Sequence, residues 1–253
     1  MRTLRDFARL FFFSPSQAAA ACAQDSSLKN GLTIYGLLLL ASAVFLGMKP
    51  TNFPDVNAAA PATAQGMMYW FKVMLWQPVL MASLIAFCGV LLSWLQTGWL
   101  PLRVAGAALW SAIPLVLTIL YVRDGLPKTF FGLLLLIWTA PLYVIARKIP
   151  SKQWRELSAF LLGLNIIECL ALVPEGIVTA MGWEAGYKGV AAGAGLWMLI
   201  SGGLGLKALP PSRPLARSLL ALLFSLILQI TVVIASFLLG WLPPETLKAL
   251  LYG

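Results

Sequence analysis

The sequence predicts an all-α fold: a bundle of about seven transmembrane helices, preceded by an amphipathic helix at the membrane surface. Hydrophobic residues make up 60% of the 253 residues and charged residues only 11%, whereas a soluble domain carries about 25% charged residues. Seven stretches are also apolar and long enough to cross a hydrocarbon layer, which takes about 17–25 helical residues. None alternates in polarity as the strands of a transmembrane barrel do, so each is expected to be a helix.

The N-terminal segment, residues 1–29, is expected to form cytoplasmic interfacial helices ahead of the bundle, residues 30–253. One face of its first helix carries three arginines: Arg2, Arg5 and Arg9. The opposite face carries three apolar side chains: Leu4, Phe7 and Phe11. Such a helix is typical of the membrane surface. We expect it to anchor the segment there, and docking of a cytoplasmic partner is the alternative.

The predicted spans are, in order, Leu32–Met48, Val79–Thr97, Val104–Val122, Thr129–Ala146, Leu157–Ala180, Val190–Leu206 and Ser218–Trp241. The fifth contains the step Pro174-Glu175-Gly176, which is expected to break it, and the sixth is short. Five, six or seven crossings are therefore consistent with the sequence. The glycines at the sixth span predict a thin helix that others approach closely: Gly189, Gly193, Gly195, Gly202, Gly203 and Gly205.

The distribution of basic residues predicts that the N-terminus is cytoplasmic. This orientation puts twelve of the 18 Lys and Arg residues inside, in agreement with the positive-inside rule. One cluster precedes the fifth span: Arg147, Lys148, Lys152 and Arg155. The net charge of +9 is then mostly a rim that faces anionic lipid head groups. We expect a bacterial inner-membrane protein that binds the bilayer and no nucleic acid.

The residue types that most catalytic sites need are scarce. The chain has no histidine, the commonest general base and the commonest zinc ligand. Its three cysteines, Cys22, Cys88 and Cys169, have no metal or disulfide spacing. We therefore expect no enzyme, no metal site and no cofactor.

Three polar side chains lie inside predicted spans and are the candidate site residues. Asn165 and Glu168 are one turn apart in the fifth span, and Gln229 lies in the seventh. A carboxylate at the centre of a bilayer costs about 3 kcal/mol, so Glu168 should face the interior of the bundle. The favoured interpretation is a structural hydrogen bond between Glu168 and Asn165. The alternative is a proton relay or a substrate contact.

The order of features along the chain also resembles a known family. It includes Phe13-Ser14-Pro15 before a short helix, Gln96-Thr97-Gly98 after the second span, Ala108 to Pro114 in the third, Ile137-Trp138 in the fourth and a basic start to the fifth. Over about residues 4–180, the chain resembles the Yip1 domain family of polytopic membrane proteins in its bacterial form.

The resemblance implies a membrane fold of five helices, so the sixth and seventh spans exceed it. Eukaryotic members of that family act in vesicle trafficking and bind small GTPases, whereas bacterial members have no assigned reaction. We do not expect the long N-terminal region of the eukaryotic members here, so the resemblance does not imply GTPase binding.

Three functions remain open from the sequence. The first is a non-enzymatic scaffold or partner subunit of Yip1-like type, with membrane-protein partners or self-association. The second is a transporter or permease subunit that uses Asn165 and Glu168. The third, a membrane-embedded lipid enzyme, rests on the basic rim alone.

Overall fold

The computed structural model describes residues 4–24, 26–50, 53, 67–96 and 98–252, and every regular element in these ranges is a helix. The helices are α1 (Leu4–Phe13), α2 (Pro15–Ala21), α3 (Ser27–Met48), α4 (Met67–Met74), α5 (Gln77–Gln96), α6 (Leu100–Asp124), α7 (Lys128–Ala146), α8 (Ser151–Leu164), α9 (Ile166–Ala180), α10 (Glu184–Ala208), α11 (Leu215–Leu238) and α12 (Pro244–Tyr252). Arg2 lies outside the described residues.

Seven helical segments in the described ranges are long and apolar enough to cross a membrane, by length and composition. They are α3, α4 with α5, α6, α7, α8 with α9, α10 and α11. The predicted all-α bundle of seven spans is therefore confirmed. The chain is a multi-pass membrane protein whose outer surface contacts lipid.

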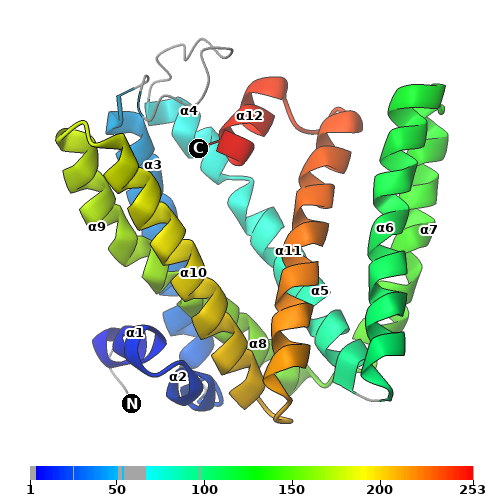
Figure 1. Ribbon diagram of the computed structural model, residues 1–253, viewed down its shortest axis with the longest axis horizontal. Coiled ribbons are helices and arrows are strands. Elements are labelled where there is room, and N and C mark those ends of the chain that lie inside the picture. Colours follow the sequence, from blue (N-terminus) through cyan, green and yellow to red (C-terminus); the bar gives the residue numbers. More distant parts are fainter. Residues whose placement is uncertain (1–3, 25, 51–52, 54–66, 97, 253) are drawn as a thin grey trace.

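The two ends of the bundle differ in what covers them (Figure 1). Helices α1 and α2 lie at one end, here named the N-terminal end, together with the α5–α6, α7–α8 and α10–α11 connections. Helices α4 and α12 lie at the opposite end, here named the C-terminal end. The α6–α7 hairpin stands at one side of the bundle, farthest from α3, α9 and α10.

Helix α1 is amphipathic, as predicted, but its apolar face is covered by protein. Phe7 and Phe11 are only 2% and 0% exposed, whereas Arg5 and Arg9 on the other side are exposed. The Phe11 ring lies 5.4 Å from the ring of Phe160 in α8, between their centroids. Phe7 and Phe11 therefore pack on the bundle and not on lipid, whereas the location of the segment at the membrane surface stays a prediction.

Glycines let neighbouring elements approach α8 closely. A Cβ atom at Gly163 would lie 2.4 Å from the Phe11 ring, so the ring occupies the space that a side chain would need. A Cβ atom at Gly31 of α3 would lie 2.9 Å from the carbonyl oxygen of Ala159, so α3 and α8 are close to backbone contact. Helix α8 is therefore the centre of the packing at this end of the bundle.

The six glycines predicted to serve packing, all in α10, divide into two groups, so the prediction is correct for only three of them. Three are buried against large side chains of α8 and α11: Gly202, Gly203 and Gly205. Three others have nothing within 4 Å of an added Cβ atom: Gly189, Gly193 and Gly195. Among these six glycines, those in close contact with another helix therefore all lie in the half of α10 toward the N-terminal end.

Two tryptophans join α6 to α7. The rings of Trp110 and Trp138 are stacked, with centroids 4.7 Å apart and planes 17° apart. Trp138 donates a hydrogen bond of 2.9 Å to the carbonyl oxygen of Trp110, and Trp110 donates one of 3.4 Å in return. Phe87 of α5 packs against both rings. This pair thus connects the hairpin to the rest of the bundle.

We expect Gly205→Val to destabilise the protein by about 1–3 kcal/mol, the usual cost of overpacking a well-packed core. A Cβ atom at Gly205 would lie 2.0 Å from Cζ of Phe160, which is 0% exposed and has no room to move. The matched control is Gly195→Val on the same helix, where the added side chain meets nothing. Thermal unfolding in detergent measures both. Equal melting temperatures would contradict the packing described above.

Candidate functional site

The break in the fifth span is made by Asn165. This residue separates α8 from α9, and its side chain is buried. Its Nδ2 atom donates to the carbonyl oxygens of Leu161 and Leu162, at 2.9 and 3.0 Å. These carbonyls lie in the last turn of α8, where helical partners run out. Asn165 therefore satisfies the backbone at the break.

The predicted break at Pro174 is wrong, because that residue lies inside α9. A proline removes one backbone donor and frees one carbonyl group, which a transmembrane helix tolerates when neighbouring groups compensate. The chain therefore stays helical at Pro174 and is interrupted nine residues earlier, at the buried amide.

Glu168 does not form the predicted hydrogen bond with Asn165. The Asn165 amide group donates to α8, and Glu168 lies exposed on the surface of α9. Its electrostatic neighbours are Tyr35 of α3 and Glu175 of α9. Glu168 and Glu175 are seven residues apart, which places them on one side of the helix.

The same side of α9 meets a lysine near the C-terminal end of the bundle. The Lys49 Nζ atom donates to the Tyr187 hydroxyl oxygen at 3.2 Å and lies 4.9 Å from the centre of that ring. Burial lowers the pKa of the Lys49 ammonium group, and the Glu175 carboxylate opposes this shift. We name this set of residues the polar row: Tyr35, Lys49, Glu168, Glu175 and Tyr187.

Gln229 is not part of this row. It lies half-buried in α11, a helix that packs against α5, α6 and α10, whereas α9 packs against α3 and α10. The two helices lie apart in Figure 1. The structure therefore does not bring Gln229 together with Asn165 and Glu168.

The predicted basic residues of the membrane surface gather at the N-terminal end, as far as the structure describes them. Arg5, Arg9, Arg147, Lys148 and Lys152 are exposed, and Arg155 is half-buried. Arg2 lies outside the described ranges. These side chains form a basic surface around α1 and the start of α8, where a bilayer has its head groups.

One buried carboxylate was missed by the sequence analysis. Glu156 of α8 is 3% exposed, and its Oε1 atom lies 4.0 Å from Nζ of Lys152. It lines a cavity of about 20 Å³ together with Arg213, which is also buried. A cavity of this size can hold about one water molecule. The i,i+4 spacing of Lys152 and Glu156 was the signal available in the sequence.

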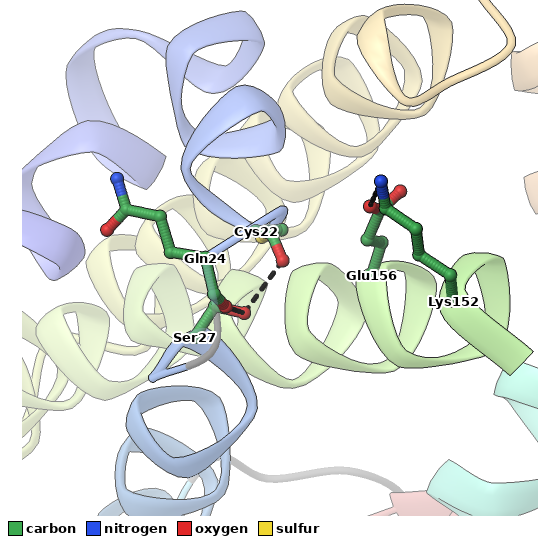
Figure 2. A network of polar contacts seen from close by, with 5 residues as sticks. All are labelled: Cys22, Gln24, Ser27, Lys152 and Glu156. Atoms are coloured by element: carbon green, nitrogen blue, oxygen red, sulfur yellow. Dashed lines mark hydrogen bonds and ion pairs between the residues drawn. The ribbon is translucent and has the colours of Figure 1, made fainter.

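Cys22 lies beside this carboxylate, at the end of α2. Figure 2 shows Ser27 close to this helix end and Glu156 with Lys152 on the neighbouring helix α8. The Ser27 hydroxyl oxygen is 2.7 Å from the carbonyl oxygen of Cys22 and 2.6 Å from that of Gln24. Burial, and to a lesser extent the charge of Glu156, raises the pKa of the Cys22 thiol to about 12.

The polar groups of the bundle serve different local purposes. Asn165 completes a helix end, Glu156 is close to a lysine, and Lys49 contacts a tyrosine. No three His, Cys, Asp or Glu residues in the described ranges are grouped as metal ligands would be. Of the three polar candidates Asn165, Glu168 and Gln229, Glu168 is the one that lies beside ionisable side chains in the described part of the chain, those of the polar row.

No family model, curated protein or solved structure matches the chain. The resemblance to the Yip1 domain family therefore stays a prediction from the order of features in the sequence.

We expect Cys22 to resist alkylation at pH 8 by about three orders of magnitude relative to an exposed cysteine, because the thiolate is the reactive form and a pKa near 12 makes it scarce. Maleimide labelling followed by mass spectrometry measures this, with Cys88 and Cys169 replaced by alanine. The matched control is Ala23→Cys with Cys22→Ala, since Ala23 is exposed.

Glu156→Gln should speed the labelling of Cys22, because it removes a charge that raises the pKa of the thiol. Equal labelling rates at Cys22 and at the introduced cysteine would contradict the burial described here.

Proposed function

We propose that the chain is a non-enzymatic membrane protein of Yip1-like type that acts as a scaffold or partner subunit in a bacterial inner membrane. Its N-terminus is cytoplasmic in this proposal. The gathering of basic side chains at the N-terminal end supports that orientation. The separate structural uses of Asn165 and Glu156 support a role other than catalysis.

The observation that carries the proposal is the loose attachment of the α6–α7 hairpin. Only 17% and 11% of its two spans are buried within the chain, against 28–56% for the other spans. Its glycines, Gly106 and Gly132, meet their neighbours only at the ordinary distances of 3.4 and 3.5 Å from an added Cβ atom. Leu109 of α6 and Leu136 of α7 are more than 70% exposed.

The occupant that we assign to the outer face of the hairpin is a transmembrane helix of another membrane protein. Helices in lipid associate by close packing of side chains, and a face of two long apolar helices provides a large surface for it. The connection through Trp110, Trp138 and Phe87 holds the inner face of the hairpin to α5 and leaves the outer face open.

A photo-crosslinking amino acid at Leu109 or Leu136 should give adducts with protein when the full chain is expressed in bacterial membranes. The matched control is the same amino acid at Val173, which is 63% exposed. Its helix, α9, lies on the opposite side of the bundle from the hairpin (Figure 1). Gel mobility and mass spectrometry separate protein adducts from lipid adducts. Lipid adducts alone at all three positions would contradict the scaffold proposal.

A transporter subunit is the second candidate, and the polar row favours it. Glu168 and Glu175 occupy one side of α9, and the Tyr35 hydroxyl group is buried with no hydrogen-bond partner in the described part of the chain. Titratable groups in succession along a helix are typical of proton pathways. In this candidate, Glu168 receives a proton at mid-depth and Glu175 with Lys49 forms the end toward the C-terminal side.

Proton uptake into liposomes under a potassium diffusion potential tests this candidate. Liposomes with the wild-type protein should acidify, and Glu168→Gln should remove at least nine-tenths of that flux. Glu245→Gln is the control, because Glu245 lies in α12 outside the polar row. If wild-type liposomes conduct no more than empty ones, the transporter candidate is wrong.

A further inference from the structure

An apolar cavity lies between α5, α6 and α7, near the N-terminal end of the bundle. Its volume is about 260 Å³, and it is partly open to the outside. Its walls include Trp94 of α5, Gly106 and Trp110 of α6, and Pro141 and Ile145 of α7. An engineered apolar protein cavity of about 150 Å³ stays dry and binds benzene. This one is therefore large enough for a segment of a hydrocarbon chain.

A cation lies against one residue of the cavity wall, Trp94, although it does not line the cavity itself. The Arg103 guanidinium carbon is 4.3 Å from the centre of the Trp94 ring, and the same ring lines the cavity. The indole nitrogen of Trp94 donates to the carbonyl oxygen of Arg103 at 3.1 Å, which holds the ring in place. The Trp94 ring therefore connects a charged group to an apolar space.

The Arg103 side chain has hydrogen-bond donors that the protein does not use. Within the described part of the chain, its guanidinium group makes no ion pair and donates no hydrogen bond. The neighbouring Arg217 is different, because it donates to the carbonyl oxygens of Gln96 and Gly98 in the α5–α6 turn. Of these two arginines at the turn, Arg103 is the one that can bind an external anion.

We propose that this cavity binds one anionic phospholipid, with an acyl chain between α5, α6 and α7 and its phosphate group on Arg103. The apolar walls suit a hydrocarbon acyl chain. The Arg103 guanidinium group carries a positive charge and parallel N–H donors, which suit a phosphate group. The site lies at the end of the bundle where the exposed basic residues gather, so the head group and the acyl chain are each in their own layer of the bilayer. Lipid binding here is independent of the scaffold function, and either can fail alone.

Native mass spectrometry of the purified full chain tests the site, with dioleoyl phosphatidylglycerol and dioleoyl phosphatidylcholine added at defined ratios. The wild-type protein should bind a first phosphatidylglycerol about tenfold more tightly than phosphatidylcholine, the effect expected of one hydrogen-bonded charge. Arg103→Gln should remove this preference. Arg9→Gln is the matched control, because Arg9 also lies over an aromatic ring at the same end, but that ring, Phe13, does not line the cavity as Trp94 does.

Filling the cavity should weaken the binding of both lipids. Gly106→Leu puts an apolar side chain beside Trp94, and we expect about tenfold weaker binding of either lipid to the site. Gly195→Leu is its control, since that position has nothing within 4 Å of an added Cβ atom. Ile145→Phe fills the cavity from α7 and should have the same effect on lipid binding. Thermal unfolding of each variant identifies any that fail to fold.

Three results would overturn the proposal. A preference for phosphatidylglycerol that persists in Arg103→Gln would exclude Arg103 as the phosphate site. Unchanged lipid binding in folded Gly106→Leu and Ile145→Phe would exclude the cavity as the site of the acyl chain. If the wild-type protein forms a dimer that excludes lipid from α6 and α7, the surface around the cavity is an interface with a second copy of the chain.

Discussion

The constraint on which the rest of this structure depends is that hydrocarbon offers no hydrogen bonds to a polypeptide backbone. Each peptide group inside the membrane must find its partner within the protein, which a helix achieves along its own length. The break between α8 and α9 shows how strict this constraint is, because a side chain supplies the missing hydrogen bonds there. Where α8 ends, the buried amide of Asn165 donates to the carbonyls of Leu161 and Leu162.

Once the backbone is satisfied, association of the helices depends on how closely they can approach, because lipid tails are as apolar as the side chains. Around α8, glycines allow neighbouring helices and rings to come close. Gly31 brings α3 close to the backbone of α8, Gly163 receives the Phe11 ring, and Gly205 of α10 receives the Phe160 ring. The α6–α7 hairpin lacks glycine contacts of this kind. Its two helices are joined by stacked indole rings, and it packs on α5 and α11 with little of its surface buried.

The all-α class and the seven spans could be predicted from the sequence, since both follow from composition and length. The role of individual residues could not, because spans that are apolar all around give no direction for a side chain. Gly193 and Gly203 look alike in the sequence, yet only the second packs against another helix. For the same reason, Glu168 was assigned to the interior although it is exposed. The apolar face of α1 was predicted, but not that Phe11 on it would pack against α8 in the core.

The positions of the charged groups are also explained by the lack of polar partners in hydrocarbon. Most lie near the helix ends, where the side chains of lysine and arginine can reach water and head groups. Glu156 is buried close to the N-terminal end, and its nearest cation in an ion pair is Lys152 at 4.0 Å, so its desolvation is offset only in part. Glu168 lies deeper, and no lysine in the described part of the chain forms an ion pair with it. The cost of an ionised carboxylate in hydrocarbon falls when the group is protonated, meets a polar partner or reaches water, so one of these is needed at the exposed position of Glu168 on α9.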